Sequence, residues 1–111
     1  MARVLRGEVY WADLEPIRGH EQGGRRPVLV LSHELFNSRS ETVIVMALTS
    51  QPRRVGYPLT WQLPPNTLPR QSWVRISQVR TIFTDRLGDR LGQLSERDLD
   101  DIVGGLLQLI G

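Results

Sequence analysis

The sequence predicts a small, mainly β fold, a compact barrel followed by one C-terminal α-helix. Short stretches rich in β-branched and aromatic residues alternate with clusters of Gly, Pro and Asn, which is typical of an all-β barrel. From Ser95 onwards the apolar residues instead recur at spacings of three and four, which indicates a helix. The 111 residues, 40% of them apolar, are enough for one hydrophobic core and too few for two. We therefore expect residues 1–111 to form a single domain.

At least five strands are expected before the helix. Three of them carry strong alternating or continuous apolar patterns and should form the core of the barrel: residues 7–14, 27–32 and 42–49. Two weaker strands, over residues 57–63 and 72–81, are separated by a Pro-Pro-Asn turn. The tryptophans in these strands are Trp11, Trp61 and Trp73. In a small barrel we expect tryptophan chiefly in the core, although its ring can also stack on nucleic-acid bases.

The C-terminal helix has both a start signal and an apolar face. Ser95 and Asp98 have the spacing of a capping box, in which the serine side chain satisfies a backbone N–H three residues later. The apolar face comprises Leu99, Ile102, Val103, Leu106, Leu107 and Ile110. Gly104 and Gly105 in mid-helix each cost about 1 kcal/mol relative to alanine. Unless the helix frays there, this pair predicts the close approach of another backbone.

The composition excludes several classes of site. The chain has no cysteine, which rules out disulfides, thiolate catalysis and sulfur-ligated zinc. His20 and His33 are its two histidines, so we expect neither a metal site nor a cofactor. No apolar run is long enough to span a membrane, and the first residues lack the apolar core of a signal peptide. We therefore expect a cytoplasmic protein without a membrane partner.

The cationic residues point to an anionic partner. All 14 are arginine, whose planar guanidinium binds phosphate bidentately and stacks on bases. Residues 1–94 hold thirteen arginines and eight acidic residues, a net charge of +5, whereas residues 95–111 carry a net charge of −3. The basic character therefore belongs to the barrel. It suits a nucleic-acid chain, although ordinary solvated charge explains it equally well.

The segment between the first two expected strands is the most unusual part of the sequence. Residues 19–27 read Gly-His-Glu-Gln-Gly-Gly-Arg-Arg-Pro, which is too long for a tight hairpin turn. Adjacent glycines permit backbone conformations closed to other residues, and a loop of this length in a small barrel is often functional. Composition alone fits a disordered surface loop equally well.

Several stretches, spread over the whole chain, occur together in a fixed order. They are residues 6–14, Pro16, residues 19–32, Asn37, residues 47–51, 56–58 and 77–81, and the C-terminal helix. In this order they resemble the MazF/PemK family of toxins, and the ordered set is far more specific than any single piece. The resemblance implies an SH3-like barrel, a homodimer, and a ribosome-independent endoribonuclease that cuts single-stranded RNA. It also implies a cognate antitoxin, whose acidic, partly disordered segment inhibits the toxin.

The resemblance implies a catalytic pair, Arg26 and Thr49. In the family these are the arginine before the proline of the loop motif and the threonine that ends the third strand. RNA carries its own nucleophile, the 2′-hydroxyl, so the protein must stabilise negative charge on the phosphate oxygens and assist proton transfer, without a metal-bound hydroxide. A guanidinium stays protonated at neutral pH and is a poor base. We therefore assign Arg26 to charge stabilisation, with protonation of the leaving group as a further role, and Thr49 to donation to a phosphate oxygen.

Without the motif, Arg26 would be read as a surface salt-bridge residue and Thr49 as an ordinary strand residue. Further residues around the pair are expected to contact RNA. Carboxylate and amide groups among them can read the edges of unstacked bases, while the arginines other than Arg80 are expected to follow phosphates. Glu21 could instead hold Arg26 or be a solvated loop carboxylate. The predicted RNA contacts are His20, Glu21, Gln22, Arg25, Ser50, Gln51, Arg53, Arg54, Gln78 and Arg80.

Two positions depart from the family pattern. Where relatives commonly have serine before Glu-Gln, this chain has His20, whose imidazole titrates near neutral pH and could serve acid–base chemistry. Because relatives carry out the reaction with serine there, we expect His20 to hold or select RNA and not to be an essential base. Arg75 stands where relatives usually have an apolar residue, which leaves the details of that strand open.

Two other functions are compatible with such a barrel. CcdB-like gyrase poisons share the barrel and the dimer but lack the loop arginine and the strand-end threonine, so Arg26 and Thr49 count against that class. A non-catalytic RNA-binding module would be hard to distinguish from a nuclease if the loop were misplaced. Incubation with a long unstructured RNA separates the three functions, because the nuclease fragments it, the binding module binds it intact and the gyrase poison does neither.

Overall fold

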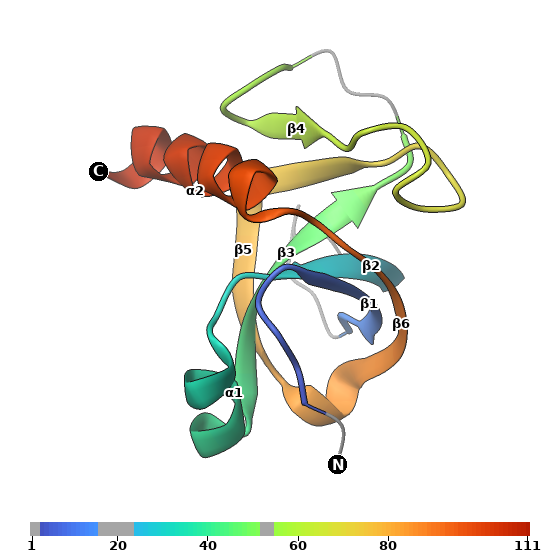
Figure 1. Ribbon diagram of the computed structural model, residues 1–111, viewed down its shortest axis with the longest axis vertical. Coiled ribbons are helices and arrows are strands. Elements are labelled where there is room, and N and C mark those ends of the chain that lie inside the picture. The colour runs from blue at the N-terminus through green and yellow to red at the C-terminus, as the bar shows by residue number, and fades with distance from the viewer. Residues whose placement is uncertain (1–2, 16–23, 52–54) are drawn as a thin grey trace.

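The structure is a computed structural model that describes residues 3–15, 24–51 and 55–111. Its elements follow in the order β1 (Glu8–Asp13), β2 (Arg25–Val30), α1 (Glu34–Ser40), β3 (Thr42–Thr49), β4 (Thr60–Gln62), β5 (Trp73–Phe83), the 3₁₀ helix η1 (Thr84–Arg86), β6 (Leu87–Gln93) and α2 (Glu96–Ile110) (Figure 1). The expected mainly β fold with a C-terminal helix is confirmed.

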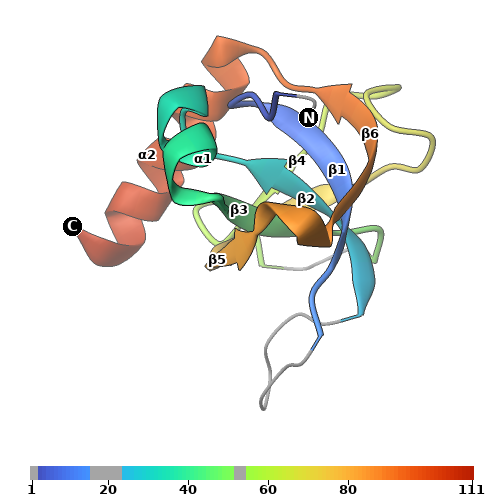
Figure 2. The same cartoon turned by 90° about the horizontal axis from the view of Figure 1, so that it is seen from below.

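All the strands belong to one antiparallel sheet in the order β4-β5-β3-β2-β1-β6. The sheet curls so that its β2, β1 and β6 end bends round toward the lower part of β5, which gives the barrel shape (Figures 1 and 2). Within the described residues the edge strands β4 and β6 do not pair, so the barrel is open along one side. The β4–β5 connection approaches this opening, since a Cβ added at Gly92 of β6 would lie 3.2 Å from the carbonyl oxygen of Thr67.

Apolar side chains pack on both faces of the curled sheet, because successive residues of a strand point to opposite sides. The α2-side cluster takes Leu29, Met46 and Leu48 from the central strands together with Leu99 and Ile102 from α2. The barrel-side cluster takes their neighbours Val28, Val30, Val45 and Ala47, together with Tyr10 and Ala12 of β1. This alternation decides which way each functional side chain on β2 and β3 points.

Helix α2 starts and packs largely as its sequence predicts. The Ser95 side chain accepts a hydrogen bond from the backbone N–H of Asp98, with an O···N distance of 3.1 Å. At Gly105 an added Cβ would lie 2.8 Å from Ile76 Cδ1 and 3.4 Å from the carbonyl oxygen of Pro58, so the close approach expected at the glycine pair is confirmed there. The apolar face is only partly buried, because Leu107 and Ile110 at its C-terminal end are exposed.

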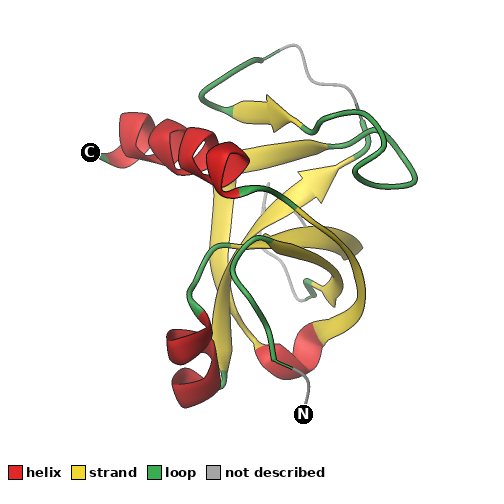
Figure 3. Ribbon diagram, viewed as in Figure 1, coloured by secondary structure: helices red, strands yellow, loops and turns green. Residues whose placement is uncertain are grey.

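Three elements were not predicted from the sequence, and some bounds differ. The 3₁₀ helix η1 is one of them. The short helix α1 and the strand β6 are both absent from the sequence-based expectation, whereas the structure contains them (Figure 3). β2 begins at Arg25, two residues before the predicted start, β4 has three residues, and β5 extends to Phe83. No helix in the described part of the chain is long and apolar enough to cross a membrane.

A buried carboxylate ties β6 to β1. Glu8 is 6% exposed and accepts hydrogen bonds from the Leu5 backbone N–H (2.7 Å), the Tyr10 hydroxyl (2.9 Å) and Arg90 Nε (2.6 Å). Burial alone would raise the pKa of Glu8, but these hydrogen bonds and the charge of Arg90 outweigh it and lower the pKa below its ordinary value. Burial and the Glu8 carboxylate together raise the pKa of Tyr10 to about 12.

Replacing Glu8 by glutamine should destabilise the fold by about 1–3 kcal/mol at pH 7, because an ionised acceptor of three hydrogen bonds is lost. Since the folded-state pKa of Glu8 is lowered, its contribution is present above the unfolded-state pKa and disappears as pH falls through the folded-state pKa. Urea unfolding at pH 7 and near pH 3 should therefore show a smaller difference from wild type at the lower pH. Glu96, whose side chain is 83% exposed in its pair with Arg6, offers the control Glu96→Gln, for which little change is expected.

Candidate active site

A groove of about 350 Å³ lies where β2 begins and β3 ends. β2 contributes Arg25, Arg26 and Pro27 to its lining, the end of β3 contributes Leu48 and Thr49, and Ser50 directly follows β3. Side chains of β1, of β6 and of the β4–β5 connection complete the walls. The groove therefore gathers residues that are far apart in the sequence, and three of the lining residues are arginines.

The register of β2 and β3 explains why Arg26 and Thr49 reach the same groove. Val28 pairs with Ala47 and Leu29 with Met46. Arg26 lies two residues before Val28 on β2 and Thr49 two residues after Ala47 on β3, so both stand at the same end of the β2–β3 pair, and both line the groove. The two residues of the predicted catalytic pair therefore line the same groove, although 23 positions separate them in the chain.

The hydroxyl of Thr49 is held in place by the backbone that follows it. Thr49 is 2% exposed, and its Oγ1 accepts a hydrogen bond from the Gln51 backbone N–H at 3.1 Å. A hydroxyl that accepts in this way still has its own hydrogen to donate. Thr49 can therefore act as a preorganised donor toward an oxygen atom placed in the groove.

Arg26 was expected in a loop, but it lies in β2. Arg25 pairs with Asp13 and Arg26 with Ala12, so both arginines are part of the β1–β2 ladder. The pairing extends to Leu14 and Gly24, because the Leu14 backbone N–H donates to the Gly24 carbonyl at 3.0 Å. Strand alternation then sends the adjacent arginines to opposite faces, Arg26 with Val28 on the barrel side and Arg25 on the α2 side. The two guanidinium groups thus leave the strand on opposite faces.

Arg25 is stacked on an aromatic ring. Its guanidinium carbon lies 5.1 Å from the centroid of the Trp11 ring, within the range of a cation–π contact. Trp11 is half-buried and lines the groove, so the expectation that it belongs to the core is wrong. Trp61 and Trp73 are half-buried too, and Trp61 packs against the α2-side cluster.

Gln78 and Arg80 of β5 are not among the described residues that line the groove. Arg80 pairs with Val45 on β3, and its Nη1 donates to the Leu14 carbonyl at 3.2 Å. Gln78 is half-buried two residues earlier on the strand. The structure therefore gives Arg80 a contact with the end of β1, at the start of the motif segment. Ser50 lines the groove, and Gln51 follows it as an exposed residue.

Five of the predicted RNA contacts lie outside the described residues: His20, Glu21, Gln22, Arg53 and Arg54. The residues that flank His20, Glu21 and Gln22 in the described part of the chain are held by hydrogen bonds. Besides the Leu14 contact, the Gly24 backbone N–H donates to Glu15 Oε1 at 2.8 Å. The described residues that flank the motif segment are therefore hydrogen-bonded to each other.

Two polar groove residues were missed by the sequence analysis, Arg70 and Ser72. Both belong to the β4–β5 connection, where Leu68 and Pro69 also line the groove. The connection reaches β6, since a Cβ added at Gly92 would lie 3.3 Å from Leu68 Cδ2. No local pattern in a proline-rich turn indicates this long-range contact, so only composition, an arginine that follows three prolines, could have drawn attention to it.

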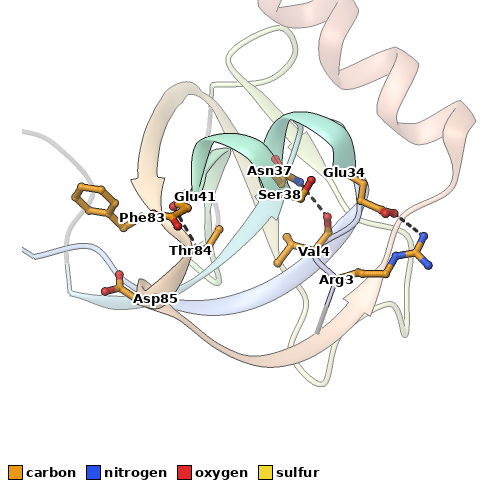
Figure 4. A pocket seen from close by; sticks show the side chains of 9 residues that line it. All are labelled: Arg3, Val4, Glu34, Asn37, Ser38, Glu41, Phe83, Thr84 and Asp85. Atoms are coloured by element: carbon orange, nitrogen blue, oxygen red, sulfur yellow. Dashed lines mark hydrogen bonds and ion pairs between the residues drawn. The ribbon is translucent and has the colours of Figure 1, made fainter. Parts of the chain in front are cut away.

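A second cavity, of about 450 Å³, lies between the N-terminal segment, α1 and the end of β5. Its charged lining is mostly acidic, with Glu34, Glu41 and Asp85 against Arg3, and Arg3 is itself hydrogen-bonded to Glu34 at 2.6 Å (Figure 4). Such a lining repels a phosphate chain. The arginine-lined groove is therefore the better candidate for the active site. In the described ranges no group of three or more His, Cys, Asp or Glu side chains could hold a metal ion.

Comparison with known proteins identifies relatives of nearly the whole chain. A family model described as PemK-like, MazF-like toxin of type II toxin-antitoxin system matches residues 5–110. The endoribonuclease EndoA of Bacillus subtilis (strain 168) is 39% identical over 101 residues, which cover 89% of this chain and 87% of the relative.

Solved structures agree with this. The crystal structure of MazF from Deinococcus radiodurans matches with a TM-score of 0.89 and 30% identity, covering 100% of this chain and 99% of that chain. A MazE-MazF structure (Form-II) from the same organism matches with a TM-score of 0.81 and 29% identity, covering 100% of this chain and 98% of that chain.

Proposed function

Since the chain belongs to the PemK-like, MazF-like family of type II toxins, we propose that it is a toxin endoribonuclease that cuts single-stranded RNA without a metal ion. The cut takes place at the groove between β2, β3 and the β4–β5 connection. The observation that carries this proposal is the meeting of Arg26 and Thr49 at that groove. We further propose that residues 1–111 are one toxin domain and that it acts in the cytoplasm.

The reaction uses a nucleophile within the substrate. The 2′-oxygen attacks the adjacent phosphorus, its proton passes to a base or to solvent, and the bond from phosphorus to the 5′-oxygen breaks as that oxygen takes up a proton. Negative charge grows on the phosphate oxygens in between, and preorganised donors that meet this charge accelerate the step. Arg26 supplies a cationic fork for these oxygens, and Thr49 supplies a hydroxyl that the Gln51 N–H orients.

RNA on either side of the cut has further contacts available. Arg25 and Arg70 present guanidinium groups at the groove, and both are exposed. Ser50 and Ser72 add hydroxyl groups that can bond phosphate or sugar oxygens. We propose that Arg53 and Arg54 follow the phosphates beyond Gln51, and that the motif residues His20, Glu21 and Gln22 contact the bases, with Gln78 and Arg80 nearby on β5.

Purified protein should fragment a long unstructured RNA at a limited set of positions, and excess EDTA should leave the rate unchanged because the nucleophile is internal. The measurement is gel electrophoresis of end-labelled RNA with and without EDTA, with the Arg26→Ala protein as the blank. A rate that falls with EDTA and returns with Mg²⁺ would contradict the mechanism. Intact RNA together with inhibition of DNA gyrase would replace it by a CcdB-like function.

The toxin should be a homodimer, and its antitoxin should compete with RNA. Light scattering at micromolar concentration should give twice the chain mass of 12.7 kDa.

The D. radiodurans neighbour was solved as a MazE-MazF structure, and we propose that an acidic antitoxin segment binds the arginine-lined groove here. Toxin co-purified with its antitoxin should then fail to bind RNA, and RNA binding by free toxin should weaken steeply with salt. A monomer, or a ternary complex with RNA, would count against this arrangement.

A further inference from the structure

The α2-side wall of the groove has the properties of a base-binding surface. Trp11 is half-buried, and its ring carries the Arg25 guanidinium at 5.1 Å from the centroid. Pro27 lies directly across from Trp11 in the β1–β2 ladder, so an apolar ring borders the stacked pair. Leu91 of β6 and Leu68 of the β4–β5 connection extend the apolar surface. Aromatic rings and guanidinium planes both stack on nucleic-acid bases, whatever the base.

Charge and position connect this wall to the predicted catalytic pair. Arg25 is the direct neighbour of Arg26, and strand alternation places the two on opposite faces at the same strand end. Arg70 lines the same groove from the connection, where it is exposed. An RNA strand that crosses this end of β2 can therefore meet Arg26 with one phosphate and reach the Trp11 side with the next nucleotide. The groove volume of about 350 Å³ falls within the size range of ligand pockets.

We propose that the Trp11–Arg25 pair is a base-binding subsite: an unpaired base of the RNA strand next to the cleaved phosphate stacks on the pair, and Arg70 contacts the phosphate of that nucleotide. The inference rests on the proposed nuclease function, because its ligand is the substrate of that reaction. It makes Trp11 a substrate-binding residue with no part in the bond-breaking step. Because stacking does not distinguish bases by hydrogen bonds, the subsite adds affinity and register and little sequence preference.

An abasic scan of the substrate tests the stacking. The probe is a short RNA that contains one mapped cleavage site with a 2′-deoxy nucleotide at the cut, so that it binds without reacting. With wild-type protein, removal of the base at one position next to the cut should raise Kd about tenfold. Trp11→Leu should raise the Kd of the intact probe by a similar factor and should be insensitive to the same base removal. Trp11→Phe, which keeps an aromatic face, should stay within about threefold of wild type.

Matched variants separate stacking from general damage. Trp61→Leu removes a half-buried tryptophan outside the groove lining and should leave RNA affinity unchanged, even though the loss of its packing against the α2-side cluster lowers the melting temperature. Arg70→Gln should weaken RNA binding and reduce the slope of log Kd against log salt by about one phosphate contact, whereas Arg97→Gln on the exposed face of α2 should not. Arg70→Gln also serves if Trp11→Leu proves unstable.

The outcomes are distinct from those of the nuclease test. If wild type cuts RNA but Trp11→Leu binds with unchanged Kd and still loses affinity on base removal, the subsite is wrong and the nuclease proposal stands. If Trp11→Leu weakens antitoxin binding alone, the wall belongs to the inhibitor and the inference is also wrong. If wild type cuts no RNA, the proposed function itself fails.

Discussion

Arg26→Ala should lower the rate of RNA cleavage by about 100-fold or more, because one preorganised donor to a developing oxyanion contributes that much. Arg26 lies at the start of β2, where it is half-buried at the groove and faces the end of β3. Its backbone pairing with Ala12 does not depend on its side chain, so the melting temperature should change little. Single-turnover cleavage of a labelled RNA, with melting followed by circular dichroism, measures both quantities.

Three comparisons make this result specific. Arg26→Lys retains the charge but not the planar fork, and it should recover only part of the lost rate. Arg39→Ala removes an exposed arginine from the last turn of α1 and should cleave at the wild-type rate. Thr49→Val removes the hydroxyl and keeps the shape that its buried position requires, so it should lower the rate without opening a cavity. Wild-type cleavage by a well-folded Arg26→Ala protein would remove Arg26 from the mechanism.

The elements predicted best are those whose local pattern and tertiary contacts agree. β3 matches its predicted bounds, because its run of β-branched residues pairs with β2 on one side and β5 on the other. α2 begins after Ser95 as its capping signal indicates. β6 was missed because its sequence, Leu-Gly-Asp-Arg-Leu-Gly-Gln, has no β-branched or aromatic residue. It forms because it pairs with β1 and because Arg90 reaches the buried Glu8, and neither contact is visible in a local window.

The short helix α1 was missed for a related reason. Its seven residues carry no apolar periodicity, and Leu35 and Phe36 are exposed. What holds it is the buried Asn37, whose Nδ2 donates to the carbonyl oxygens of Val4 and Ser32 at 3.0 and 3.1 Å. A helix anchored by one polar side chain through long-range hydrogen bonds leaves little trace in the sequence.

The candidate site was only partly accessible to sequence reasoning. The resemblance selected Arg26 and Thr49, and both line one groove in the structure. It did not indicate that Arg25 and Arg26 lie in a strand, which is what sends their side chains to opposite faces. Arg70 and Trp11 enter the groove through long-range packing of the β4–β5 connection and of β1. A spacing pattern cannot contain that information.

One 2′-deoxy nucleotide on the 5′ side of the cut should abolish cleavage at that position, since the oxygen that attacks phosphorus is then missing. Other cleavage positions in the same RNA should react at their usual rate. In unmodified RNA the attack forms a 2′,3′-cyclic phosphate, or its 3′-phosphate product, and releases a 5′-hydroxyl. Polynucleotide kinase should therefore label the downstream fragment without prior phosphatase treatment.

The deoxy probe should still bind, because phosphate contacts by arginines and base contacts at the groove do not require the missing hydroxyl. We expect Arg26 to act mainly on the transition state, so its removal should change ground-state binding little. The Kd of the deoxy probe with wild-type protein should therefore lie within about threefold of the Kd of unmodified RNA with the Arg26→Ala protein. Binding with complete loss of cleavage would place the nucleophile on the RNA and leave charge stabilisation and proton transfer to the protein. Cleavage of the deoxy probe at the modified position would instead require an activated water molecule, and neither the guanidinium of Arg26 nor the hydroxyl of Thr49 is a suitable base for activating it at neutral pH.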